Sequence, residues 1–231
     1  MTVSVVEKCK KGCFMDALFD EITWWIILAG TGLAVLGIGS VSGVPVVLAN
    51  GKLDLPNAYS VTVDDKYGVS LAVEHLVARG RKNIYYIKDR DTDSAKSKRD
   101  GFLEAMRRNG LEFADHVLEA GETLASGMET VQALLAQGIV PDGIVCGEDL
   151  TAAGALKALL RAGLRVPGQV AVVGFNNSDY AHLCEPVLTS VDNKPEQVAL
   201  LCVQLLESSI ERSEAYSSVV LQPELAQGET S

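Results

Sequence analysis

The chain has 231 residues, of which 48% are hydrophobic and 22% charged, a globular composition long enough for one large or two medium α/β domains. Its formal net charge of -10 argues against nucleic-acid binding by the chain itself, because an acidic surface repels phosphates. Five cysteines at scattered spacings are typical of a reducing compartment: Cys9, Cys13, Cys146, Cys184 and Cys202. The close pair Cys9 and Cys13 lacks a second pair at ligand spacing, so no metal site is predicted.

Residues 24–41 form an uncharged, apolar stretch near the start of the chain. Its length is at the lower limit for a membrane-spanning helix, whereas its glycines and the preceding Asp20 and Glu21 argue against one. We interpret the stretch as a buried strand over 25–29 followed by a Gly-rich loop. A membrane anchor remains the alternative. The pattern Gly30-x-Gly32 lacks the third glycine of a dinucleotide-binding fingerprint, so no cofactor is predicted.

From residue 44 onward, apolar runs of strand length alternate with amphipathic stretches of helical length. The predicted strands are 44–49, 60–63, 83–87, 116–119, 142–146, 170–175, 188–191 and 217–221. The predicted helices are 67–79, 94–109, 123–137, 150–162 and 195–212. Each of the first four ends at a glycine, which is a typical helix stop. This alternation predicts an α/β fold with doubly wound parallel sheets.

Polar side chains follow several of these strands, at the point where each strand ends. They include Lys98 and Arg99 in the helix after 83–87, Glu148 and Asp149 after 142–146, Asn176 after 170–175 and Asn193 after 188–191. Because the carboxyl ends of parallel strands meet at one edge, we expect a polar cleft there. Carboxylates, amides and a cation suit a polyhydroxylated ligand. The alternative for residues such as Asp149 is helix capping alone.

A catalytic site is hard to assemble from this sequence. The three histidines, His75, His116 and His182, have no nucleophile or activating partner placed for them, and there is no phosphate-binding Gly-x4-Gly-Lys-Ser/Thr. We therefore expect a binding protein and not an enzyme.

Taken together, these segments resemble the effector-binding core of the LacI/GalR family of transcriptional regulators. The matching stretches, in order along the chain, are 44–54, 63–87, 94–111, 141–177 and 185–193. The family shares its fold with periplasmic sugar-binding proteins. The resemblance therefore implies a two-subdomain, periplasmic-binding-protein-like type I fold.

The resemblance also assigns the predicted ligand residues. In the family, an Arg three residues before a Gly-aromatic pair contacts the sugar. Here Gly101-Phe102 sets the register, so Lys98 takes that position and Arg99 lies next to it. Lys is a point donor where Arg would be bidentate, so the contact differs in detail.

Three further positions of the family pattern stay polar but change residue type. The Asn-Asp pair of the family becomes Glu148-Asp149, and its Gly-aromatic-Asp turn becomes Gly174-Phe175-Asn176. The polar residue after the Leu-Thr motif is Asn193. A sugar or sugar-like effector is therefore expected, while its identity is not predicted.

The amino-terminal part departs from the family pattern. Family members begin with a helix-turn-helix head and a hinge helix, and neither is recognisable here. The resemblance predicts a truncated N-terminal subdomain over 1–62, completed by the segment 193–212. A C-terminal effector-binding subdomain over 63–192 and a C-terminal strand and tail over 213–231 complete the chain.

The resemblance implies a cytoplasmic, ligand-sensing domain that regulates transcription as a homodimer. DNA would be bound only by members that carry the helix-turn-helix. The alternative is a sugar-binding protein of an ABC-type transporter, anchored to the membrane by residues 24–41.

Overall fold

The computed structural model describes residues 45–51, 57–88, 91–111, 113–210 and 218–231, and the chain divides into two compact units. Unit 1 comprises residues 1–61 and 201–218, and unit 2 comprises residues 62–200 and 219–231. The strand predicted at 25–29, the stretch 24–41 and the pair Cys9 and Cys13 lie outside the described residues.

The described part of unit 1 contains parallel strands and most of one helix. β1 (Val46–Ala49) pairs in parallel with β2 (Ala58–Val63), with Val46 opposite Ala58. Their three-stranded sheet has the order β1-β2-β8, where β8 is Ser218–Leu221. The helix α9 (Pro195–Ile210) begins in unit 2 and ends in unit 1. The strands and the helix predicted for these segments are confirmed.

Unit 2 is built on a six-stranded sheet of order β4-β3-β5-β6-β7-β9. The bounds of its strands are β3 Ile84–Lys88, β4 Val117–Glu119, β5 Gly143–Cys146, β6 Ala171–Phe175, β7 Thr189–Asp192 and β9 Glu224–Ala226. Neighbouring strands are parallel, which confirms the α/β prediction, except that β9 runs antiparallel to β7 at the edge. The returning chain thus adds one short antiparallel strand at the edge of the predicted parallel sheet.

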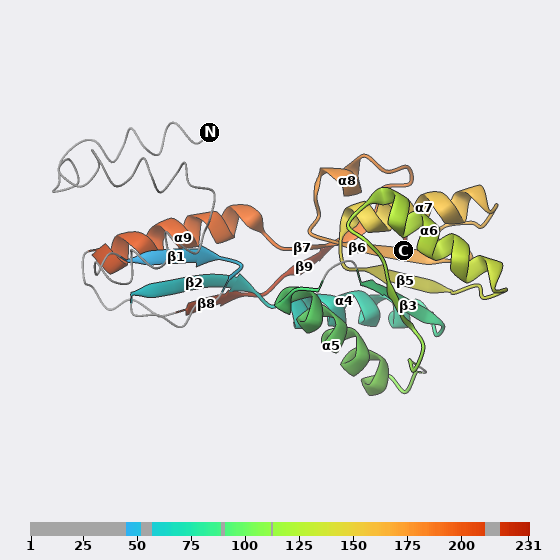
Figure 1. Ribbon diagram of the computed structural model, residues 1–231, viewed down its shortest axis with the longest axis horizontal. Coiled ribbons are helices and arrows are strands. Elements are labelled where there is room, and N and C mark those ends of the chain that lie inside the picture. The colour runs from blue at the N-terminus through green and yellow to red at the C-terminus, as the bar shows by residue number, and fades with distance from the viewer. Residues whose placement is uncertain (1–44, 52–56, 89–90, 112, 211–217) are drawn as a thin grey trace. The chain divides into compact units, whose positions relative to one another are not determined.

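Helices cover both faces of this sheet, as expected of a doubly wound fold (Figure 1). One face carries α4 (Asp65–Ala78) and α5 (Asp93–Arg108), and the other carries α6 (Leu124–Ala136) and α7 (Asp149–Arg161). Each face encloses its own hydrophobic core, centred on side chains such as Phe102 and Tyr86 on the first and Leu159 and Ile144 on the second. A further short helix, α8 (Asp179–His182), follows β6 and was not predicted.

Glycines let the helices of each pair approach backbone to backbone. A Cβ atom at Gly101 of α5 would collide with the carbonyl oxygen of Lys66 in α4. A Cβ at Gly154 of α7 would likewise collide with the carbonyl oxygen of Leu124 in α6. The position of α5 matters for the site, because this close approach fixes where the side chains of its first two turns lie.

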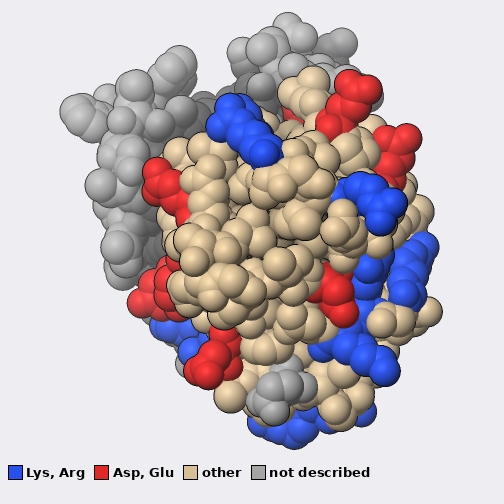
Figure 2. Space-filling model, turned by 90° about the vertical axis from the view of Figure 1, so that its right-hand side faces the viewer, with Lys and Arg blue, Asp and Glu red and all other residues tan. Residues whose placement is uncertain are grey.

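The surface carries charges of both signs. Figure 2 shows one face on which Lys, Arg, Asp and Glu side chains lie around a broad, mostly uncharged centre. Several basic residues lie in the last turn of a helix, among them Arg107 and Arg108 of α5 and Arg161 of α7, where they complement the helix dipole. Within the described ranges, no helix is long and apolar enough to span a membrane. The same part of the chain holds no cluster of residues suited to a metal ion.

Candidate functional site

Lys98 places a buried ammonium group at the carboxyl edge of the sheet in unit 2. It lies in α5 and is only 5% exposed. Its Nζ donates a hydrogen bond of 2.9 Å to the carbonyl oxygen of Gly147 and lies 3.8 Å from the carboxylate of Glu148. The same Nζ is 3.9 Å from the centre of the Phe175 ring, a cation–π contact. Lys98 therefore joins α5 to the ends of β5 and β6.

A chain of amide contacts continues from Glu148 across the next two strands. Asn176, directly after β6, donates through Nδ2 to the Glu148 carboxylate. Asn193, directly after β7, donates through Nδ2 to Oδ1 of Asn176 at 2.6 Å. The Oδ1 atom of Asn193 is buried and has no hydrogen-bond partner among the described residues. Four of the six predicted ligand residues thus form one connected polar cluster: Lys98, Glu148, Asn176 and Asn193.

The turn after β6 has unusual backbone geometry. Asn176 and Asn177 have φ angles of 99° and 50°, in the left-handed region that few residues other than Gly, Asn and Asp tolerate. Asn177 is held by hydrogen bonds from its backbone N–H to Ser190 Oγ at 3.0 Å and from Nδ2 to Asp192 at 3.3 Å. This turn directs the Asn176 side chain toward Glu148.

Asp149, a predicted ligand residue, is buried behind this cluster. It is 1% exposed, and both of its carboxylate oxygens already accept hydrogen bonds. Oδ1 accepts from Ser190 Oγ at 2.6 Å, and Oδ2 accepts from the backbone N–H and the hydroxyl of Ser178 at 2.7 and 2.8 Å. Burial raises the pKa of Asp149, and the hydrogen bonds from Ser190 and Ser178 oppose that rise. Asp149 therefore ties the end of β7 and the turn after β6 to the start of α7.

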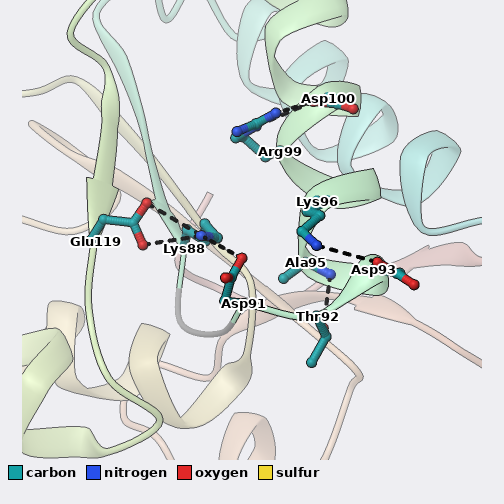
Figure 3. Close-up of polar contacts among 9 residues, drawn as sticks. All are labelled: Lys88, Asp91, Thr92, Asp93, Ala95, Lys96, Arg99, Asp100 and Glu119. Carbon is teal, nitrogen blue, oxygen red and sulfur yellow. Dashed lines mark hydrogen bonds and ion pairs between the residues drawn. The ribbon is translucent and has the colours of Figure 1, made fainter.

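Arg99 is not brought into the cluster. Its guanidinium pairs with the carboxylate of the adjacent Asp100, at 2.9 Å, on the exposed side of α5 (Figure 3). Figure 3 also shows Lys88, at the end of β3, between Glu119 and Asp91, with Nζ–carboxylate distances of 3.3 and 3.6 Å. These ion pairs engage Lys88 apart from the Lys98 cluster.

Asp65, which the sequence analysis did not select, also belongs near Lys98. It lies in the first turn of α4, and burial raises its pKa, while a hydrogen bond with Ser94 and the charge of Lys98 lower it. The signal was present in the sequence, because Asp64 and Asp65 directly follow a strand as the other site residues do. The site thus presents one ammonium, two carboxylates and two amides, which suits recognition of a small ligand rich in hydrogen-bonding groups.

Comparisons with known proteins place the chain in a family. The model of a periplasmic binding protein-like domain matches residues 73–231. An HTH-type transcriptional regulator of Lachnoclostridium phytofermentans is 32% identical over 164 residues, covering 71% of this chain and 49% of that protein. The chain therefore spans about half the length of this curated relative.

Solved structures agree with this assignment. The crystal structure of a LacI transcriptional regulator from a Rhodococcus species is 31% identical, with a TM-score of 0.77, and the match covers 87% of this chain and 75% of that one. A complex of the transcriptional regulator CelR with cellobiose is 27% identical, with a TM-score of 0.75, over 85% of this chain and 62% of that one. These relatives are regulators and give no support to the transporter alternative. The chain belongs to the LacI family of transcriptional regulators, and it comprises the periplasmic-binding-protein-like region of that family.

Proposed function

We propose that this chain is the ligand-sensing region of a LacI-type regulator and that its effector is a sugar or a sugar-like molecule. The single observation that carries the proposal is the continuous polar cluster of Lys98, Glu148, Asn176 and Asn193. Four separate elements supply these side chains at one edge of the sheet, where ligands of open α/β sheets bind. Helix capping alone does not explain the cluster, because Glu148 makes no side-chain cap bond to α7.

The chemistry of the cluster supports a neutral, hydroxyl-rich ligand. A sugar hydroxyl both donates and accepts, so it can accept from the Lys98 ammonium and donate to Glu148 or to the unpartnered Oδ1 of Asn193. The complex of the relative CelR with cellobiose is consistent with such a ligand. We propose sensing and not catalysis, because ammonium, carboxylate and amide groups of this kind suit recognition.

We further propose that units 1 and 2 correspond to the two subdomains expected from the sequence and that the protein acts as a homodimer. Ligand binding in such a protein would shift the balance between two conformations and so control transcription. DNA contact would belong to a helix-turn-helix head, which the acidic chain described here does not replace. A cytoplasmic location follows from this role.

Isothermal titration calorimetry against a panel of sugars, polyols and sugar phosphates tests the proposal. Lys98→Met keeps the aliphatic stem but removes the charge, and Asn176→Gly removes the amide while keeping the left-handed backbone accessible. For the ligand that binds, we expect each substitution to raise Kd by about 10- to 100-fold, as for loss of a charge-assisted or buried hydrogen bond.

Arg99→Met is the matched control, because Arg99 lies one residue away but pairs with Asp100 instead of entering the cluster. It should leave Kd within about threefold of the wild type. Equal Kd values for the wild type, Lys98→Met and Asn176→Gly would show that the ligand binds elsewhere.

A further inference from the structure

Lys194 has a backbone conformation that lysine rarely adopts. Its φ angle is 52°, and in the described part of the chain it is the one residue with a positive φ that is neither Asn nor Gly. This left-handed backbone is strained for lysine, because the Cβ atom crowds the carbonyl oxygen that follows it. Strain of this kind persists only where the surroundings hold it, and it gathers at ligand-binding positions. The preceding residue is Asn193, the last member of the polar cluster.

Three sets of contacts hold Lys194 in this conformation. Its backbone N–H donates to Oδ1 of Asp192 at 2.7 Å. Its carbonyl oxygen accepts from the backbone N–H groups of Gln197 and Val198, both at 3.0 Å, and so begins α9. Its Nζ forms an ion pair with the carboxylate of Glu224. The lysine side chain is only 18% exposed, so water screens this pair less than a pair between two exposed side chains.

These contacts fix the backbone on both sides of Asn193. Glu224 lies in β9, directly opposite Asp192 of β7 in the antiparallel register. The second carboxylate oxygen of Asp192 accepts from Nδ2 of Asn177, at 3.3 Å, in the turn after β6. Asn193 therefore has the sheet residue Asp192 before it and the anchored Lys194 after it.

We propose that Lys194, held by Glu224, is a positioning residue that keeps the Asn193 amide oriented for the effector. The inference rests on the proposed function and adds how one of its ligand groups is pre-organised. Asn193 donates to Asn176 at 2.6 Å and keeps its Oδ1 buried, without a hydrogen-bond partner among the described residues. An amide that is already held offers this oxygen to a ligand without the cost of ordering it on binding. A residue that served only to begin α9 would need neither a left-handed backbone nor an ion pair.

NMR spectroscopy of the ¹⁵N-labelled full chain tests this role without any ligand. The signals of the Asn193 side-chain amide are identified by their loss in Asn193→Asp. Lys194→Gly removes the ammonium group while tolerating the left-handed backbone. We expect the Asn193 side-chain amide to exchange with water about tenfold faster in this variant. The melting temperature should stay within about 2 °C of the wild type, because the relieved strain offsets the lost ion pair.

Two comparisons keep the result specific. The side-chain amide of Asn109, bonded to the Ala105 carbonyl oxygen at 2.8 Å within α5, should exchange at the same rate in both proteins. Arg108→Met is the matched control variant, because it also breaks an ion pair between two elements, that of α5 with Glu74 of α4. It should leave the exchange of the Asn193 amide unchanged. A lower melting temperature for Lys194→Gly with unchanged exchange at Asn193 would show a purely structural role and overturn the proposal.

A charge exchange tests the ion pair while keeping a large side chain at position 194. Lys194→Glu and Glu224→Lys should each speed exchange of the Asn193 amide by about tenfold, because each places like charges together. The double variant should return the rate to within about threefold of the wild type. A double variant that restores nothing would refute the part assigned to Glu224.

Calorimetry links the positioning to ligand binding. For each sugar of the panel that binds the wild type, Lys194→Gly and Glu224→Gln should raise Kd by about five- to tenfold. Equal Kd values for the wild type and both variants would overturn the positioning role and leave the proposed function standing. If no sugar of the panel binds the wild type, the proposed function fails, and the exchange rates of the Asn193 amide still decide whether Lys194 holds it.

Discussion

The buried carboxylate of Asp149 is predicted to hold the site together and not to touch the ligand. Asp149→Ala would remove the acceptors of three donors: the Ser190 hydroxyl, the Ser178 hydroxyl and the Ser178 backbone N–H. Each of the two hydroxyls can turn to another acceptor, so the loss of its hydrogen bond costs about 0.5 kcal/mol. The backbone N–H cannot turn and would stay buried without an acceptor, which costs about 2 kcal/mol. The free energy of unfolding of unit 2 should therefore fall by about 3 kcal/mol.

Urea unfolding followed by far-UV circular dichroism measures this loss. With a slope of about 2 kcal/mol per molar urea, the midpoint should fall by about 1.5 M. Asp149→Asn keeps one oxygen acceptor for Ser178 and can donate to Ser190, so it should cost only about 1 kcal/mol. Asp179→Ala, an exposed carboxylate in the neighbouring short helix, is the control and should change stability by less than about 0.5 kcal/mol. An Asp149→Ala variant as stable as this control would refute the reasoning.

Two further predictions concern the scaffold. Burial, and then the charge of Arg79, lowers the pKa of His75 to about 4, below the 6.5 of an unperturbed histidine. The unfolded chain therefore binds the proton more readily, and stability should fall as the pH drops from 6.5 towards 4, by roughly 1 to 1.5 kcal/mol once solvent screening is allowed for. His75→Gln should flatten this slope in pH-dependent urea unfolding, and an unchanged slope would contradict the assignment. Gly154→Ala should destabilise the α6–α7 pair by about 1 to 2 kcal/mol in thermal unfolding, although Ala has a higher helix propensity than Gly, because the new methyl group meets the Leu124 carbonyl oxygen. Glu129→Ala, on the exposed side of α6, is the control. Equal melting temperatures for the two variants would contradict the close contact.

Most elements of unit 2 could be predicted because hydrophobic periodicity and helix-ending glycines both mark them. The start of α4 was placed two residues late, since the capping residue Asp64 and the polar first turn carry no apolar signal. The helix α8 was missed because four residues are too short to show a helical period, and the strand β9 was missed because Glu224–Ala226 holds no apolar run of strand length. The antiparallel direction of β9 depends on where the chain returns, which no local pattern encodes.

The site was predictable to the level of strand ends but not of individual roles. Lys98 and Arg99 are adjacent in sequence, yet successive helical residues point about 100° apart, so only one of them could face the sheet edge. The family register favoured Lys98, and the structure directs Arg99 to Asp100. Asp149 was predicted as a ligand residue because a carboxylate suits a hydroxyl-rich ligand. The hydrogen bonds that occupy both of its oxygens come from residues 29 and 41 positions away in the chain, so no local pattern reveals them.

The left-handed backbone at Asn176 has a consequence for reading related sequences. A φ of 99° restricts this position mainly to Gly, Asn and Asp, whatever the chain binds. The residue type at position 176 is therefore determined first by the backbone of the turn and only then by the ligand. Lys98 lies within a regular helix and Glu148 has extended backbone, so neither position is restricted in this way. Substitutions at 98 and 148 are the ones that should track a change of effector as the family diversifies.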